Sequence, residues 1–215
     1  MSNLNAKFGA IAKHMRNGSK DVPLRAYYVK GDYATALYVG DPVSRIAGDS
    51  NAAEIKVAAG SMVGGAEKFP AGSLQKVERA ANGDTNAITG FIQKIGFAVS
   101  DASAFRAGYK PASTEAVVFV ADHPDTIFEL QCSAACATTD VGKVANLTGS
   151  GGSTVTGLSN VELDSSSLAT GNATYQLQVV GVSTDMMNND ASSNYVNALV
   201  RINNHTDVDV AKAGV

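Results

Sequence analysis

The chain is short of the residues that build disulfide frameworks, membrane spans and nucleic-acid surfaces. It has 215 residues with two cysteines and no tryptophan, and charged residues make up only 17% of it. Two cysteines in a chain of this length do not make a disulfide framework. The net charge of −3 argues against a nucleic-acid binder, because such a protein would carry a basic stripe. No apolar run approaches the ~18 residues of a membrane span.

The N-terminus also lacks an apolar core of signal-peptide length, so we expect synthesis and use in the cytoplasm. Small and polar residues are plentiful instead, and they fill the spaces between short apolar runs. This composition is typical of many short strands joined by loops rather than of long helices. A chain of this length can bury a core in one all-β domain.

The stretch from Thr114 to Gln131 carries the clearest strand pattern. A run of β-branched and aromatic residues from Ala116 to Ala121 is broken by Asp122-His123-Pro124-Asp125, and the strand pattern resumes at Thr126. Pro124 has no N–H to give to a β-ladder, so it belongs in a turn. The pattern predicts a hairpin whose two faces are both apolar, buried inside a sandwich or barrel.

Further short apolar runs follow one another between turn signals such as Gly40-Asp41-Pro42. Gly90 and Gly96 interrupt the longest run and predict bulges or bends, as at a barrel corner. The fold class that this pattern favours is all-β, a jelly roll, β-sandwich or small β-barrel with long loops. Beside the hairpin, strands are expected at 25–29, 36–39, 43–46, 54–58, 74–79, 87–99, 161–163, 174–182 and 195–203.

The chain divides into three parts by composition. Residues 1–25 form an N-terminal arm, residues 26–205 a single β-rich domain, and residues 206–215 a polar C-terminal tail. Within the domain, residues 132–172 are a loop-rich excursion in which residues 134–144 are expected to hold one helical turn.

The apolar residues of the N-terminal arm are compatible with two conformations, a helix and an extended segment. Leu4, Phe8, Ile11 and Met15 recur at spacings of three and four, which places them on one face of a helix. The alternative is an extended arm, because Gly9 and the shortness of the segment weaken a lone helix. Either form needs a cover, which is the arm's own domain or another subunit.

Candidate reaction chemistry is sparse. Asp122, His123 and Asp125 place a histidine between two carboxylates, as in a metal site or an acid–base pair. A turn whose aspartate side chains bond the local backbone explains the same residues more simply. Cys132 and Cys136 lack the further ligands of a zinc site and are interpreted as two small, semi-buried thiols. We therefore expect no catalytic residue, no cofactor and no metal.

Seven short phrases occur in order over most of residues 26–205, and as an ordered set they resemble one family. The resemblance is to the head decoration, or cement, proteins of tailed bacteriophages. No phrase encodes chemistry by itself, so the resemblance depends on their order and spacing. The phrases are DYATALYVGDPV (32–43), ITGFIQKIGF (88–97), YKPASTEAVVFVADHPDTIFELQ (109–131), TTDVGKVANL (138–147), TVTGLSNVELDSS (154–166), LQVVGV (177–182) and LVRINNH (199–205).

The resemblance implies a structural virion protein, made in the host cytoplasm, that binds the outer surface of an icosahedral capsid. Its partners would be the major capsid protein and itself, as a homodimer or homotrimer, with no nucleic acid and no membrane. It would cement neighbouring capsid subunits after the head expands. Aromatic and methionine residues are enriched at interfaces. The candidate capsid or subunit contacts are therefore Phe8, Ile11, Met15, Tyr27, Tyr28, Met186, Met187 and Tyr195.

Proteins of two other functional classes can have the same amino-acid composition. A tail or fibre module, or a β-rich virion adhesin, is the first alternative, although a fibre would more often show repeats or a coiled coil. An enzyme on a β scaffold is the second. It would need converging titratable groups, and the sequence offers only the turn around His123.

Overall fold

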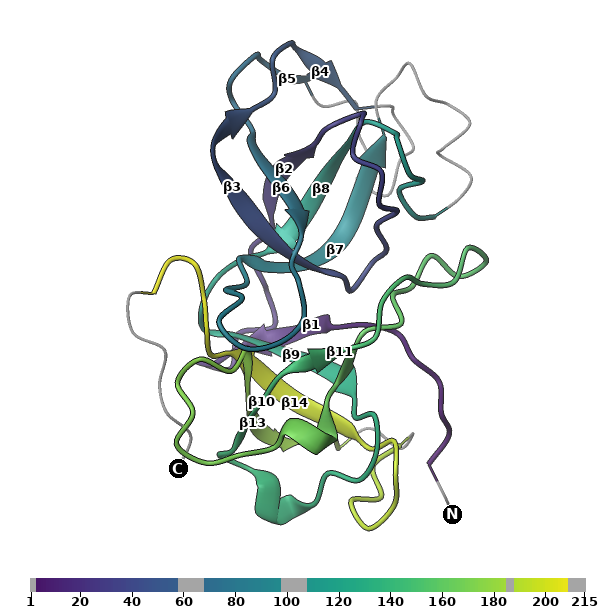
Figure 1. Ribbon diagram of the computed structural model, residues 1–215, viewed down its shortest axis with the longest axis vertical. Helices are drawn as coiled ribbons and strands as arrows, with labels where there is room; N and C mark the ends of the chain where they lie inside the picture. Colours follow the sequence, from purple (N-terminus) through teal and green to yellow (C-terminus); the bar gives the residue numbers. More distant parts are fainter. Residues whose placement is uncertain (1–2, 58–67, 98–107, 185–187, 209–215) are drawn as a thin grey trace.

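The structure is a computed structural model that describes residues 3–57, 68–97, 108–184 and 188–208 (Figure 1), and its fold confirms the all-β prediction. The principal strands form a closed barrel and an open five-stranded sheet, with two small two-stranded ribbons beside them. The strands are β1 (Ile11–Met15), β2 (Arg25–Val29), β3 (Pro42–Ser50), β4 (Ile55–Lys56), β5 (Lys68–Phe69), β6 (Gln75–Arg79), β7 (Gly90–Phe97), β8 (Ala116–Ala121), β9 (Thr126–Gln131), β10 (Val144–Ala145), β11 (Leu147–Thr148), β12 (Glu162–Leu163), β13 (Leu177–Val182) and β14 (Asn197–Ile202).

The barrel has the strand order β2-β6-β3-β7-β8 and closes where β8 pairs with β2. The side chains of β8 alternate between two apolar clusters. Val118 and Val120 enter the cluster inside the barrel, whereas Val117 and Phe119 join a second cluster with Tyr28. Both faces of β8 are therefore covered by apolar side chains, and closure leaves the barrel with no free strand edge.

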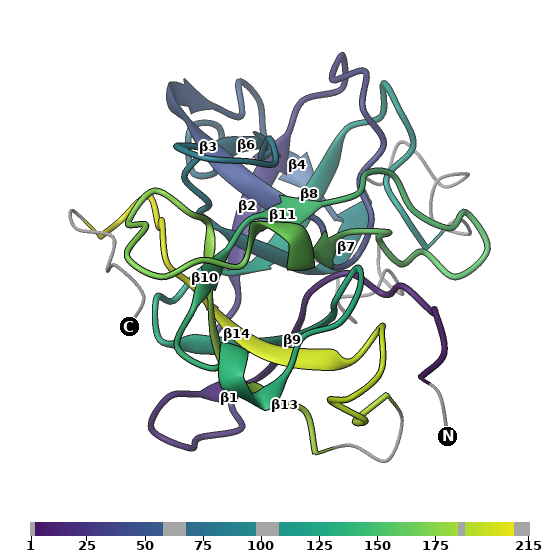
Figure 2. The same ribbon diagram turned by 60° about the horizontal axis from the view of Figure 1, so that its bottom comes forward.

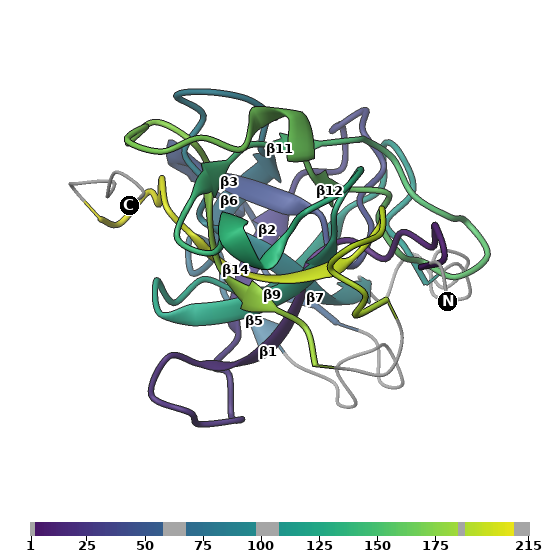
Figure 3. The same cartoon turned by 90° about the horizontal axis from the view of Figure 1, so that it is seen from below.

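The open sheet has the strand order β1-β9-β14-β13-β10, and its neighbours are all antiparallel. One face of it packs into the largest core, together with the ribbon β11–β12 (Figure 3). Ala198, Val200 and Ile202 on β14 are buried in that core, together with Val196 just before the strand.

The predicted hairpin of 114–131 is wrong, because its two strands form as expected but do not pair with each other. β8 lies between β7 and β2 in the barrel, whereas β9 lies between β1 and β14 in the sheet. All twelve positions of the two strands are buried, so each strand needs covering neighbours on both edges and both faces. The segment from Asp122 to Asp125 is therefore a crossing from one sheet system to the other.

Contacts of Asp122 direct this crossing. Its carboxylate accepts a hydrogen bond from the Tyr27 hydroxyl at 2.7 Å and pairs with the Arg25 guanidinium at 3.2 Å. Its backbone oxygen lies 2.9 Å from Nε2 of the buried His205. The expectation that aspartate side chains bond the local backbone of this turn is wrong for Asp122, whose partners lie on β2.

The barrel and the sheet pack against each other through one shared core (Figure 2). The rings of Phe91 on β7 and Phe128 on β9 lie 4.8 Å apart between centroids at a tilt of 59°. Nearby, Gly9 and Gly40 cross so closely that a Cβ on Gly9 would lie 2.8 Å from the Cα of Gly40. Both glycines have positive φ, so other residues are excluded there by backbone strain as well as by space.

The longest predicted strand is bulged, but not at its glycines. The register between β7 and β8 shifts between Ile92 and Lys94, which puts the bulge at Gln93. Gly96 pairs regularly, and Gly90 instead leaves room for the carbonyl of Ala121, which a Cβ would overlap. The Gln93 side chain then crosses to β1, where it accepts a hydrogen bond from the Ala12 N–H at 2.9 Å and donates one to the Ala10 carbonyl at 3.1 Å.

The N-terminal arm is extended, so the helical alternative is wrong. β1 pairs with β9 at the edge of the sheet, and Gln93 bonds its backbone from the barrel side. These partners satisfy the backbone of residues 10–15 without a helix, and tertiary pairing outweighs a helical spacing in so short a segment. Within this chain the arm's own fold buries Met15 and half-buries Phe8 and Ile11, whereas Leu4 stays exposed.

The remaining expectations concern a helical turn, a short strand and the ends of two segments. The helical turn expected in 134–144 is confirmed as a 3₁₀ turn, Thr138–Asp140, and a second one follows at Ser165–Ser167. The expected strand at 36–39 is reduced to isolated bridges at Leu37 and Val39. The last part of the expected strand 87–99 and the tail from residue 209 onward lie outside the described residues.

Candidate functional site

The outer face of the five-stranded sheet is only partly covered by the rest of the chain. At one end the N-terminal segment crosses it, and the Gln131 amide bonds the Leu4 carbonyl at 2.8 Å and the Ala6 N–H at 3.1 Å. Beyond this crossing, the residues that alternate with the buried face point outward, including Val180 on β13 and Leu199 on β14. This open part of the sheet is a groove, which we call the docking groove.

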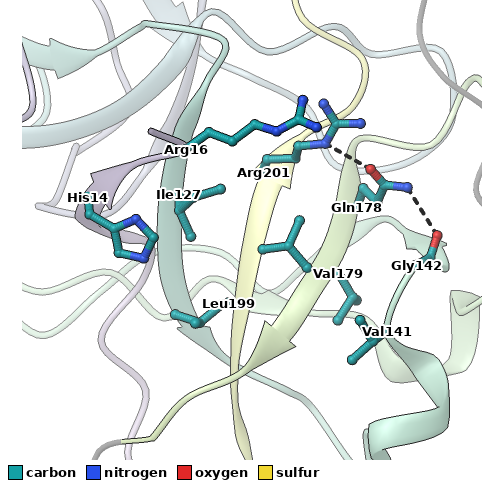
Figure 4. Close-up of a pocket in the computed structure, with 10 residues that line it drawn as sticks. His14, Arg16, Ile127, Val141, Gly142, Gln178, Val179, Leu199 and Arg201 are labelled. Atoms are coloured by element: carbon teal, nitrogen blue, oxygen red, sulfur yellow. Dashed lines mark hydrogen bonds between the residues drawn. The ribbon is translucent and has the colours of Figure 1, made fainter. Parts of the chain in front are cut away.

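The docking groove has a volume of about 460 Å³ and crosses strands β9, β14 and β13 (Figure 4). Its floor is aliphatic, with Ile127, Leu199 and Val180 contributed by neighbouring strands. Its rim at one end is basic. The complete lining is His14, Arg16, Ile127, Val141, Gly142, Gln178, Val179, Val180, Leu199 and Arg201.

Two further hollows continue the docking groove, because each shares lining residues with it. One of about 200 Å³ shares Arg16 and Arg201 and adds Asp125. The other, of about 550 Å³, shares His14 and Leu199. We refer to the three hollows, which share these lining residues, together as the strip.

Exposed apolar side chains gather along this strip. Five large apolar residues are exposed in the part of the chain that the structure describes. Val141 and Val180 line the docking groove and Val208 lines the smaller hollow, so three of these five lie on the strip. Single exposed apolar residues are ordinary on protein surfaces, whereas a cluster in a concavity marks a contact surface.

The basic end of the docking groove is held in place by a hydrogen-bond chain. Nε of Arg201 donates to Oε1 of Gln178 at 2.8 Å, and Nε2 of Gln178 donates to the Gly142 carbonyl at 3.1 Å (Figure 4). Gln178 and Arg201 are direct cross-strand partners, so the sheet register itself sets this contact. The chain of bonds fixes one edge of the guanidinium and leaves the other for a ligand.

Arg16 stands beside Arg201 at this end. Burial, and after it the charge of Arg16, lower the pKa of Arg201, while the charge of Asp125 raises it. Within the described residues, neither Arg16 nor Arg201 forms an ion pair with a carboxylate. Two neighbouring guanidiniums without a paired acid favour an anion between them, since each offers forked N–H donors.

The strip is basic although the whole chain has a net charge of −3. Arg16, Arg201, Lys13 and Lys20 line its three hollows, and Asp125 is the single carboxylate among their lining residues. Lys13 is already paired with Glu129 on β9, at 2.5 Å. The strip therefore differs in sign from the average surface of the protein.

The contact residues predicted from the sequence lie elsewhere. Tyr27, Tyr28 and Met15 are buried, and the hydroxyls of the two tyrosines donate to Asp122 and Glu115 at 2.7 and 2.9 Å. Burial is the main cause that raises the pKa of Tyr27 and of Tyr28 to about 12. These three residues belong to the chain's own core, which removes them as surface anchors.

The remaining predicted contacts are more accessible. Phe8, Ile11 and Tyr195 are half-buried, and none of the predicted contacts inside the described residues lines the docking groove. Met186 and Met187 lie outside the described residues. The prediction relied on residue type, whereas the groove is built from ordinary aliphatic residues and arginines. The available signal was positional, because Leu199 interrupts the polar side of β14.

The other sequence candidates have structural roles. The Asp125 N–H donates to Nδ1 of His123 at 3.1 Å, so the histidine ring caps this turn. The described residues contain no group of three or more His, Cys, Asp or Glu side chains placed to hold a metal ion. Cys132 and Cys136 are free and fully buried rather than semi-buried, and a hydrogen bond between the thiols raises the pKa of Cys132.

No protein-family model, curated protein or solved structure matches this chain. In the described part of the chain, no helix is long and apolar enough to cross a membrane.

Proposed function

We propose that this chain is a structural virion protein that binds the outside of a bacteriophage capsid and cements neighbouring subunits of the major capsid protein. The observation that carries the proposal is the docking groove, an open apolar surface with a basic end on an otherwise well-covered fold. The ordered sequence phrases add the particular class, because they resemble the decoration proteins of tailed phages.

The resemblance extends over both parts of the fold. Its phrases include the whole of β7, β8 and the crossing to β9, and they also include β13 and most of β14. Strands β9 and β13 and most of β14, which form the docking groove, therefore lie within the part of the chain that resembles this family. A protein of the proposed class would use such a surface to bury apolar area across a seam between capsid subunits.

The groove is small for a stable one-to-one complex, and the proposed function does not need one. Many copies bound to one lattice, each as part of a homodimer or homotrimer, would gain affinity through avidity, so each contact can be modest. Three functional consequences follow: high copy number, binding to the outer surface, and a more stable expanded head.

The test is the number of copies in purified virions, measured by gel densitometry against the major capsid protein. The proposal predicts a ratio near one to one, or a fixed fraction set by a dimer or trimer. A few copies per particle would replace it with a tail or vertex component. Absence from virions would overturn it.

A further inference from the structure

The docking groove combines three features that together specify the chemistry of its ligand. It has an aliphatic floor, a pair of guanidiniums at one end, and a lining without a carboxylate, although Asp125 lines the adjoining hollow with both arginines. The lining of the groove holds no phenylalanine, tyrosine or tryptophan, its single ring is the imidazole of His14, and its floor is aliphatic, so it offers no row of rings on which successive nucleic-acid bases could stack. An acidic ligand with aliphatic groups is therefore a better complement than a nucleic acid.

The size of the groove indicates the conformation of that ligand. Adjacent strands lie about 4.8 Å apart, so the path from β9 across β14 and β13 to the 141–142 loop is about 15 Å long. An extended peptide of four or five residues covers that length at about 3.3 Å per residue. A helix of the same length and about 10 Å across would fill about 1,200 Å³. The groove, at about 460 Å³, matches the extended form better.

The positions of the lining groups set the pattern within the segment. Side chains of an extended segment alternate between its two sides, so those on one side can enter the floor between Leu199 and Val180 while the other side faces water. At the basic end, Gln178 holds one edge of the Arg201 guanidinium. A carboxylate there can accept hydrogen bonds from Arg16 and from the remaining edge of Arg201.

We propose that the docking groove binds an extended acidic segment of the protein partner, with aliphatic side chains on the Leu199–Val180 floor and a carboxylate between Arg16 and Arg201. This inference rests on the proposed function, since it names the part of the capsid partner that would occupy the groove. It differs from a general surface contact in requiring both opposite charge and an alternating aliphatic pattern.

The probe is a synthetic hexapeptide that alternates glutamate with valine, titrated into isotopically labelled protein and followed by NMR. The proposal predicts shifts confined to the amides around the groove, on β9, β13, β14 and residues 14–16 and 141–142. A matched peptide with glutamine in place of glutamate is expected to bind at least tenfold more weakly, and added salt is expected to weaken the acidic peptide.

Variants of the protein separate charge from shape. Arg16→Gln should weaken the acidic peptide several-fold, and the Arg16→Gln/Arg201→Gln double variant should weaken it at least tenfold. The double variant also removes the hydrogen bond between Arg201 and Gln178, which could disturb the sheet. The single Arg16→Gln variant avoids this, because Arg16 is exposed and the Arg201–Gln178 bond stays intact. Lys68→Gln on β5 removes one exposed cation from the barrel side and should leave binding unchanged.

A second pair of variants tests the floor. Val180→Asp places a carboxylate inside the groove and should abolish peptide binding, whereas Val155→Asp, at a residue 92% exposed and outside the groove, should have no effect. Peptide shifts that lie outside the groove, or that survive both the arginine and the Val180 changes, would overturn the proposal. Stronger groove shifts with a single-stranded oligonucleotide than with the acidic peptide would also overturn it, in favour of nucleic acid.

Binding of the same variants to capsids distinguishes this inference from the proposed function. Capsid binding that is unaffected by the groove variants would refute the acidic segment and leave the cement function standing. Groove-specific peptide binding by a protein that is absent from virions would leave the segment standing and refute the cement function.

Discussion

The barrel and the five-stranded sheet cover the second faces of their strands differently. In the barrel, β8 has one face in the closed interior and the other against the cluster around Tyr28. In the sheet, β14 buries Val200 on one side and leaves Leu199 half-buried on the other. The difference indicates which part of the molecule is built for internal stability and which part retains a surface for a partner.

The contrast extends to strand edges. Closure removes the edges of the barrel, whereas the sheet keeps β1 as an edge strand. The bulge at Gln93 lets a barrel side chain bond the backbone of Ala10 and Ala12, so the barrel covers part of the edge that the sheet leaves open. The outer face of the five-stranded sheet, rather than its β1 edge, is then the surface that remains available to a partner.

The largest expected effect comes from breaking the contact that joins the two parts. Phe128→Ala removes a fully buried ring that packs on Phe91, and we expect it to lower the free energy of unfolding by about 3–5 kcal/mol. Urea denaturation measures the change. Val155→Ala, at an exposed position, is the control and should alter stability by less than about 0.5 kcal/mol. A loss for Phe128→Ala as small as that of the control would mean that the two parts do not stabilise each other.

The next effect compares the two faces of one strand. Val200→Ala opens a cavity in the core and should cost about 2 kcal/mol, whereas Leu199→Ala, on the outer face, should cost less than about 1 kcal/mol. Binding should show the reverse order, because Leu199 belongs to the groove floor and Val200 does not. Chemical denaturation and the peptide titration provide both numbers. Equal stability losses would show that the outer face is part of the core.

A smaller effect tests the cover of the β1 edge. Gln93→Ala removes two hydrogen bonds to the arm and should cost about 1–2 kcal/mol. Hydrogen exchange at residues 10–15 should become faster in this variant. Gln75→Ala, at an exposed position of the barrel, is the matched control. Unchanged exchange in the arm would mean that pairing with β9 alone holds β1.

The smallest effect concerns pH and the buried tyrosine of the crossing. Burial and then the contact with Asp122 raise the pKa of Tyr27 to about 12, so the folded state favours the neutral phenol. An unfolded tyrosine loses its proton near pH 10, so this contribution is complete below pH 10 and is lost as the pH rises toward 12. Tyr27→Phe should make the alkaline decline of stability shallower. An identical decline in both proteins would assign the alkaline loss to other groups, Tyr28 among them.

Much of the local structure was predictable because it depends on alternation. The faces of β8 and β14, the helical turn near Asp140 and the all-β class follow from residue types at neighbouring positions. Pairing was not predictable in the same way. A strand that is apolar on both faces, such as β8, has no preferred neighbour in its own pattern, so the shortest connection misleadingly indicated a hairpin with β9.

The groove was missed for a related reason. Tyr27 and Tyr28 resemble interface anchors by type, but their positions on a barrel strand bury them, and their hydroxyls find partners inside the fold. Arg16 and Arg201 are distant in sequence and meet only because β1 and β14 both pair with β9. A site formed by such pairing leaves no local motif.

Hydroxyl-radical footprinting of the protein, free and after it is added to capsids that lack it, shows which face of the protein meets the capsid. If the docking groove is that face, binding lowers the oxidation of the groove side chains Val180 and Leu199, while exposed barrel side chains keep their reactivity. Protection of the barrel with an unchanged groove would contradict this assignment.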